Sequence, residues 1–228
     1  MGVAENLKRI QARIESACAR AGRDPREIKL VAVSKNQPVA LIEEAIAAGV
    51  TIFGENRVQE AATKIPLIRA PVQWHLVGTL QTNKVKRALE LFSMIQSVDS
   101  LHLAEELQRR CEQKGMKIPV LIEVNTSAEP TKHGVTPEGL PELLGQVLAL
   151  DRLVVSGLMT IGPGLAVENP EASRACFRLL FRLKQELKQR FGIPLPELSM
   201  GMSADFEVGI EEGATMIRIG TALFGPRP

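Results

Sequence analysis

The sequence of 228 residues predicts a single (β/α)₈ barrel of the α/β class. Short runs rich in apolar and β-branched residues alternate with amphipathic stretches from residue 28 to the C-terminus, which is typical of parallel βα units. Several runs, such as 30–33 and 120–122, are apolar on both faces, as strands are when helices cover them outside and a core fills them inside. Barrels of this length commonly form one domain, so residues 1–228 are expected to be one domain.

The elements follow from this periodicity. The strand candidates cover residues 28–35, 51–56, 73–79, 94–99, 119–126, 153–161, 197–203 and 215–220, and eight strands are what a closed barrel requires. Apolar residues between the runs recur with helical spacings, for example at Ala104, Leu107 and Cys111 and at Phe177, Leu180, Leu183 and Leu187. An extra helix precedes the first strand, with an apolar face of Leu7, Ile10, Ile14, Ala17 and Ala21 and a stop at Gly22. We expect it to lie outside the barrel and cover its bottom.

Composition excludes several classes of protein. Hydrophobic residues make up 45% and charged residues 24%, as in a soluble protein with a full core, and the net charge of +2 is too small for a nucleic-acid-binding face. Three dispersed cysteines, Cys18, Cys111 and Cys176, indicate neither a disulfide framework nor a zinc site. No stretch has the apolar length of a leader or a membrane span, so a reduced, cytoplasmic protein is expected.

Polar residues end most of the runs, and a barrel places its active site there. Lys35 is the most informative, because period-two alternation puts it on the same strand face as Val31 and Val33. If that face points into the barrel, burial disfavours the ammonium form and makes a neutral, nucleophilic amine available near pH 7. Such an amine forms imines with aldehydes. The alternative is a lysine that ends a strand and extends to water.

An anion site is indicated near the C-terminus. Ser203 ends the seventh run, and Gly220 and Thr221 follow the eighth, where barrels often bind phosphate. Gly220 lets the backbone approach an anion, while the hydroxyl groups and the first amides of a following helix can donate to it. The alternative is ordinary capping by small residues.

Arg218 shares a strand face with Met216, so we expect it to point inward beside the anion site and to stay charged. The alternative is a structural ion pair with Glu123 or Asp99. The residues alone therefore describe an imine-forming lysine opposite an anion site. That arrangement fits an aldolase acting on a phosphorylated sugar and a protein that stores pyridoxal 5'-phosphate (PLP) equally well.

His75 and Asn56 are weaker candidates, because a lone histidine is more often a satisfied core residue than a ligand or base. A metal-dependent hydrolase that uses His75, Glu123 and Asp99 is a more distant alternative.

A family resemblance decides between the two main alternatives. Its motifs are VAVSK at 31–35, FGEN at 53–56, WHLVGTLQTNK at 74–84, GLMT at 157–160, LSMGMS at 198–203 and RIGT at 218–221. With these motifs the chain resembles the PLP homeostasis protein family, also known as the YggS or PROSC family, over nearly its whole length. The resemblance implies a fold similar to the barrel domain of alanine racemase, without that enzyme's second domain.

The resemblance also implies roles for individual residues. Lys35 would hold PLP, the vitamin B6 cofactor, as a Schiff base, and Ser203, Gly220 and Thr221 would hold its phosphate. Arg218 would face the pyridine nitrogen, and Asn56, His75 and Met200 would line the ring. Lys132 matches a family lysine near the mouth, whereas Asn36 and Gln37 stand where the family usually has a second basic residue.

The relation to alanine racemase raises the question of catalysis. The second base of that enzyme is a tyrosine from the other subunit's extra domain, and this sequence contains no tyrosine. An arginine at the pyridine nitrogen would also keep the ring a poor electron sink, a feature that the racemase shares. The expectation is a PLP carrier or regulator that balances PLP with amino-acid and keto-acid pools, without robust turnover; a racemase is the alternative. Apo-PLP enzymes are the expected recipients, and a monomer or weak dimer is the expected assembly.

Overall fold

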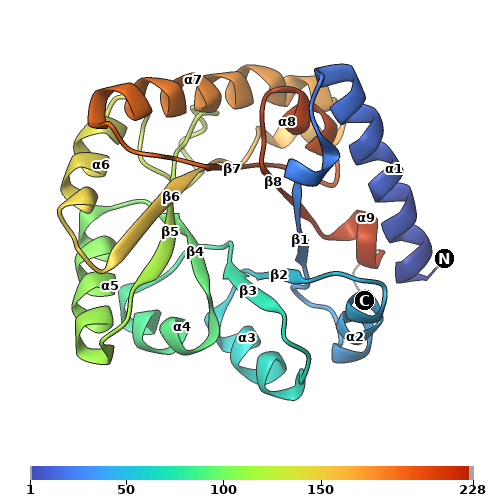
Figure 1. Ribbon diagram of the computed structural model, residues 1–228, viewed down its shortest axis with the longest axis horizontal. Coiled ribbons are helices and arrows are strands. Elements are labelled where there is room, and N and C mark those ends of the chain that lie inside the picture. Colours follow the sequence, from blue (N-terminus) through green and yellow to red (C-terminus); the bar gives the residue numbers. More distant parts are fainter. Residues whose placement is uncertain (1, 226–228) are drawn as a thin grey trace.

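The computed structural model describes residues 2–225, in which eight parallel strands close into a barrel in chain order, from β1 to β8 (Figure 1). The strands are β1 (Lys29–Val33), β2 (Ile52–Glu55), β3 (Gln73–Leu76), β4 (Met94–Val98), β5 (Ile118–Glu123), β6 (Leu153–Met159), β7 (Glu197–Met202) and β8 (Met216–Ile219). Each lies within one of the eight predicted runs or extends it by a single residue at one end. The predicted (β/α)₈ barrel is therefore confirmed.

Helices surround the strands (Figure 1). They are α1 (Val3–Ala21), α2 (Val39–Ala47), α3 (Val58–Lys64), α4 (Val85–Leu91), α5 (Leu101–Lys114), α6 (Leu140–Leu148), α7 (Arg174–Phe191), α8 (Phe206–Glu211) and α9 (Thr221–Phe224). Short 3₁₀ turns cover Pro25–Glu27, Ile65–Leu67, Thr82–Lys84, Gly164–Val167 and Pro170–Ser173. The last two lie in the long connection after β6.

The extra N-terminal helix forms as predicted but occupies a different place. α1 ends at Gly22, whose φ of 64° is the left-handed conformation that closes many helices. It packs against α8, α9 and α2 at the side of the barrel and does not cover the bottom (Figure 1). The reason is that α8 and α9 have only six and four residues, so α1 covers the barrel wall that they leave open.

Alternation along the strands separates two apolar cores. Residues such as Ala32, Phe53 and Leu76 belong to the large core between strands and helices. A smaller cluster fills the barrel itself and consists of Val31, Val77, Met94, Leu121, Met159 and Met216, with Val33, Ile52 and Ile161 packed against it. Val31 and Val33 therefore face the interior, as the sequence predicted for that face of β1.

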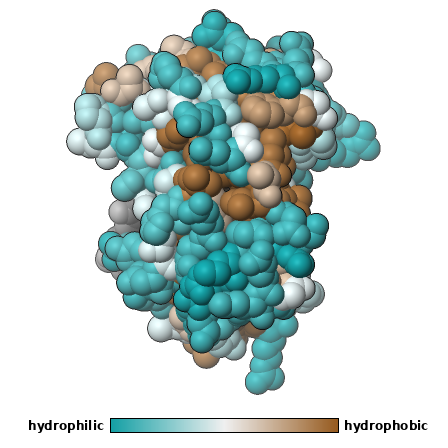
Figure 2. Space-filling view, turned by 90° about the vertical axis from the view of Figure 1, so that its left-hand side faces the viewer, coloured by the Kyte–Doolittle hydropathy of each residue, from teal (hydrophilic) through white to brown (hydrophobic). Residues whose placement is uncertain are grey.

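The side of the molecule that carries α5 and α6 is largely hydrophilic (Figure 2). On this side, apolar residues gather mainly in a band across the middle (Figure 2). Among residues 2–225, no helix combines the length and the apolar character needed to span a bilayer.

Candidate functional site

A cavity of about 440 Å³ opens at the carboxyl ends of the strands. Its lining includes Val77 and Ile161 from the barrel core, Glu123 at the end of β5, and Asn56 after β2. An adjoining cleft of about 600 Å³ shares Asn56 and extends toward Lys84. Pockets of this size accept small organic ligands, and the carboxyl ends of the strands are where barrels carry their active sites.

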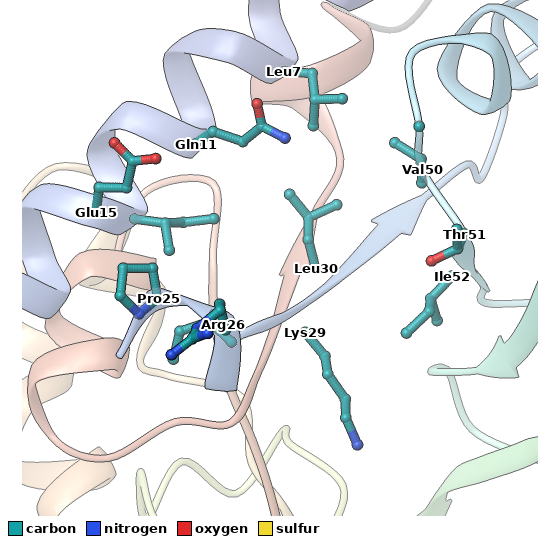
Figure 3. A pocket seen from close by; sticks show the side chains of 13 residues that line it. Leu7, Gln11, Glu15, Pro25, Arg26, Lys29, Leu30, Val50, Thr51 and Ile52 are labelled. Atoms are coloured by element: carbon teal, nitrogen blue, oxygen red, sulfur yellow. The ribbon is translucent and has the colours of Figure 1, made fainter. Parts of the chain in front are cut away.

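Another cavity, of about 590 Å³, lies at the opposite end of the strands, between α1 and the beginnings of β1 and β2 (Figure 3). Leu7, Leu30 and Val50 line it, and in Figure 3 the side chain of Lys29 points away from Leu30. The polar residues that the sequence singled out are absent from its lining.

Lys35 lies in a tight turn directly after β1. The amide of Gln37 donates to the carbonyl of Ser34 at 3.0 Å, and Asn36 has a φ of 59°. A positive φ at the third residue of a four-residue turn is the geometry of type II turns, and asparagine tolerates it better than most residues. The Lys35 side chain is half-buried. The turn thus ends β1 abruptly and leaves Lys35 at the rim of the barrel.

The three phosphate candidates lie next to this turn. Ala32 on β1 is paired with Ile219 on β8, so Gly220 stands beside Val33; a Cβ on Gly220 would be 3.3 Å from the Val33 carbonyl oxygen. Ser203 joins them from β7, because its hydroxyl oxygen accepts a hydrogen bond from the Ala222 amide at 3.2 Å. β1 and β8 are neighbours in a closed barrel, so the anion candidates stand beside Lys35 and not opposite it, which corrects the expectation from sequence.

Arg218 is almost completely buried, with 4% of its surface exposed. Its two terminal nitrogens donate to the Ser199 hydroxyl and to the Thr160 carbonyl, both at 2.7 Å. Within the described chain it forms no ion pair with Glu123 or Asp99, so the alternative of a structural ion pair is wrong. Burial lowers the pKa of Arg218 to about 10, which still leaves the guanidinium charged at neutral pH.

A relay of hydrogen bonds continues from Arg218 to His75. The Ser199 hydroxyl donates to Gln96 Oε1 at 2.7 Å, and the Gln96 amide nitrogen lies 2.9 Å from His75 Nδ1. Because the amide nitrogen is a donor, Nδ1 accepts and the proton of the imidazole is on Nε2. Burial, reinforced by the charge of Lys29, lowers the pKa of His75 to about 4, so the ring is neutral at pH 7.

His75 does not line the mouth cavity; Val77, two positions later on the same face, does. Gln96, Ser199 and Thr160 were not among the residues singled out from sequence. Gln96 and Ser199 lie within strands, and Thr160 directly follows β6. Period-two alternation could have identified Gln96 and Ser199 as inward-facing neighbours of Met94 and Glu197.

Glu123 is the acidic residue of the mouth cavity, and only 4% of it is exposed. Burial raises the pKa of its carboxyl group to about 7; Asp99 raises it further and Arg218 lowers it. Among residues 2–225, no hydrogen bond or ion pair engages its carboxylate. Its carboxyl group is therefore available to a ligand or to water.

Met200 does not reach the mouth, which corrects the prediction that it lines a bound ring. It is fully buried in the core between strands and helices, because its neighbour Ser199 points inward to Gln96. Gly201 has a φ of 92°, which interrupts the alternation, and the next methionine, Met202, is 37% exposed at the end of β7. Met202 is the methionine that the strand leaves near the rim.

Two loops border the cavity on the side away from Lys35. Lys132, in the loop after β5, donates to the carbonyl of Gly162 in the loop after β6. The Gly164 amide in turn donates to Glu129 at 3.1 Å, and Glu129 also forms an ion pair with Lys132. The two loops are therefore bonded to each other where they border the cavity.

The residues at the mouth fit PLP by their chemistry. An amine, two hydroxyl groups and a glycine stand on neighbouring strand ends, and a charged guanidinium lies beneath them. The unpartnered Glu123 and the mouth cavity supply room and an acceptor beside them. A metal centre has no such support, since in the part of the chain described here no three His, Cys, Asp or Glu side chains are grouped to hold an ion.

Comparisons with known proteins agree with this geometry. Residues 6–228 match the model of the alanine racemase N-terminal domain. The pyridoxal phosphate homeostasis protein of Aquifex aeolicus is 48% identical over all of this chain and 99% of its own, and that of Pseudomonas aeruginosa is 44% identical over 99% and 96%.

Solved structures give the same result. PipY of Synechococcus elongatus with PLP bound superimposes with a TM-score of 0.85 at 38% identity, covering 98% of this chain and 100% of PipY. Alanine racemase of Clostridium difficile, with a TM-score of 0.80 at 15% identity, covers all of this chain and 57% of the racemase, and shares the fold. The chain belongs to the pyridoxal phosphate homeostasis protein family, whose barrel is that of the alanine racemase N-terminal domain.

Proposed function

We propose that this protein binds PLP at the mouth of the barrel, holds it as a Schiff base on Lys35, and serves PLP homeostasis as a carrier and not as an enzyme. The observation that carries the proposal is the pairing of Ala32 with Ile219, which puts the Lys35 turn beside Gly220 and Thr221. An amine and a group of phosphate donors within one small molecule's length match a ligand that has an aldehyde at one position and a phosphate at another. Relatives named for PLP homeostasis, and PipY with PLP bound, support the choice of ligand.

Each residue has a defined part in this proposal. The hydroxyl groups of Ser203 and Thr221 and the backbone at Gly220 donate to the phosphate. Asn56, at the end of the neighbouring strand β2, borders the ring. Arg218 approaches the pyridine nitrogen from below, and His75 acts on it only through Gln96 and Ser199.

Arg218 narrows the reactions that an enzyme could carry out at this site, without excluding racemisation. Bound PLP supplies an aldehyde and a ring that can accept electrons when its nitrogen is protonated. Arg218 keeps its proton at neutral pH and therefore leaves the pyridine nitrogen unprotonated. The chain contains no tyrosine to act as the second base of a racemase. Racemisation remains the second candidate, because alanine racemase shares the barrel.

The test is borohydride reduction of the purified protein, followed by peptide mapping. We expect the cofactor to be fixed to the peptide that contains Lys35, and Lys35→Ala to lower the PLP retained by at least about tenfold, or about 1.4 kcal/mol. Lys86→Ala, an exposed lysine on α4, is the matched control and should retain PLP. If Lys35→Ala retained as much PLP as wild type, attached to another side chain, the proposal would be overturned.

The alternatives give different results in two further assays. A racemase would convert single L-amino acids to D-isomers at ordinary enzyme rates, measured by chiral chromatography. An aldolase would be colourless as purified and trapped by borohydride only after a sugar phosphate is added. The carrier proposal also includes apo-PLP enzymes as recipients, a cytoplasmic location and a monomer or weak dimer. Light scattering at several concentrations tests the assembly.

A further inference from the structure

The turn that carries Lys35 is held from outside the barrel by the last residue of α3. Lys64 ends that helix with 9% of its surface exposed, and its ammonium group donates to the Ser34 carbonyl at 2.8 Å. The contact joins residues 30 positions apart in the chain. A buried ammonium group therefore fixes the backbone immediately before Lys35.

Glu60, one helical turn earlier, fixes the backbone immediately after Lys35. Its carboxylate accepts a hydrogen bond from the Asn36 amide at 2.5 Å and forms an ion pair with Lys64. Asn36 is one of two residues other than glycine with a positive φ in the described chain. Such a conformation persists when surrounding contacts impose it, and the bond to Glu60 is a contact of that kind.

Glu55 completes the cluster beneath the turn. Its Oε1 accepts from the Ser34 hydroxyl at 2.7 Å and from Lys64 at 3.1 Å. Its other oxygen is buried and has no partner. Burying the two ionisable groups of Glu55 and Lys64 in this way is expensive, because their attraction repays the loss of hydration only when every oxygen and proton is satisfied. A contribution to folding stability alone is therefore a poor explanation of the cluster.

We infer that Lys64 and Glu60 are positioning residues, which hold the Ser34–Gln37 turn so that the Lys35 amine is presented to the mouth in one place. The effect on cofactor capture rests on the proposed function, whereas the effect on the turn does not. The chain offers a matched comparison in Lys184, a second buried lysine whose ammonium group donates to the Pro196 carbonyl at 3.0 Å, before β7. Pro196 adjoins no residue of the site.

The experiment compares Lys64→Met with Lys184→Met in the full chain, with and without PLP. Hydrogen exchange of the peptide that contains Asn36 and Gln37 should rise at least about tenfold in Lys64→Met, beyond any rise in Lys184→Met, because only the former releases the turn. The rate of borohydride-trapped PLP on Lys35 should fall about tenfold in Lys64→Met alone. Affinity for pyridoxine 5'-phosphate, which has no aldehyde, should change less than about twofold.

Glu60 provides a second route if Lys64→Met does not fold. Glu60→Ala should speed exchange at Asn36 and slow trapping, and Glu60→Gln, which keeps an oxygen acceptor for the Asn36 amide, should restore slow exchange. Equal exchange and equal trapping in the Lys64 and Lys184 variants would overturn the inference and leave the proposed function intact. Faster exchange in Lys64→Met, with no PLP trapped on wild-type Lys35, would overturn the proposed function and support the positioning of the turn by Lys64.

Discussion

The two ends of the barrel interior treat their polar residues differently. At the bottom, Lys29 forms an ion pair with Glu197, and Thr215 donates to the second oxygen of that carboxylate at 2.8 Å while accepting from the Leu198 amide. At the mouth, no residue of the described chain engages the Glu123 carboxylate. Polar groups at the bottom thus satisfy one another, whereas the Glu123 carboxylate at the mouth is left for a ligand, as expected for the stabilising and the binding face of a barrel.

Between the two ends lies the relay of His75, Gln96, Ser199 and Arg218. Its members satisfy each other below the mouth, and Arg218 anchors it to the Thr160 carbonyl. The part of the interior in which polar groups satisfy one another, here called the matched interior, therefore extends from the bottom up to Arg218. The part with an unpartnered polar group begins at Glu123. Four substitutions test where that boundary lies.

The largest effect is expected for Arg218→Met. The substitution leaves the Ser199 hydroxyl and the Thr160 carbonyl buried without their donor, and each unsatisfied group costs about 1–3 kcal/mol. We expect the free energy of unfolding to fall by about 4 kcal/mol, measured by urea denaturation without PLP. A loss below about 1 kcal/mol would show that the relay does not belong to the matched interior.

Glu123→Gln should raise the free energy of unfolding, whereas Arg218→Met should lower it. The folded protein raises the pKa of Glu123 from 4.5 to about 7, so it favours the protonated form, and this contribution to stability is lost as pH rises through about 7. The shift corresponds to about 3 kcal/mol at pH 8. Glu123→Gln should therefore be more stable than wild type by about 3 kcal/mol at pH 8 and equally stable at pH 4, by urea denaturation at each pH.

Glu138→Gln is the control for that measurement, because Glu138 is exposed on the loop before α6. It should change stability by less than about 0.5 kcal/mol at either pH. A destabilised Glu123→Gln at pH 8 would mean that the ionised carboxylate has a stabilising partner and that the mouth is as well matched as the bottom.

His75→Gln tests the relay from its other end. The folded protein lowers the pKa of His75 from 6.5 to about 4, so it favours the neutral ring, and the resulting stability is lost as pH falls from about 6.5 toward 4. Wild type should lose about 2 kcal/mol between pH 8 and pH 5 through this residue. His75→Gln should lack that part of the acid sensitivity. If the slope of stability against pH is the same in His75→Gln as in wild type, His75 has the same pKa in the folded and the unfolded protein.

The sequence was sufficient for the barrel because its evidence is local. Alternation and helical spacing are read within a few residues, and they predicted all eight strands and the existence of the helix α1 correctly. The position of α1 around the barrel was not available in the same way, because an amphipathic pattern gives the face that is buried and not the neighbour that buries it.

The residues of the site show the same difference between local and long-range evidence. Rules for strand ends identified Lys35, Ser203, Gly220 and Thr221, which the barrel closure then placed on adjacent strands. Met200 was proposed from the family resemblance and was wrong, because its neighbour Ser199 faces the interior and alternation turns Met200 outward. Lys64 escaped notice, since its contact with Ser34 spans 30 residues and leaves no local pattern.

The smallest effect is expected at the bottom, for Lys29→Met. The side chain of Lys29 is 47% exposed, so water screens its attraction to Glu197, and such pairs contribute about 1 kcal/mol or less. Thr215 would still donate to the carboxylate and share its charge. Urea denaturation should show a loss below about 1 kcal/mol, with PLP retention unchanged. A loss near 3 kcal/mol would instead make the bottom pair as important as the relay, and matching of polar groups would then increase from the mouth downward without a boundary at Arg218.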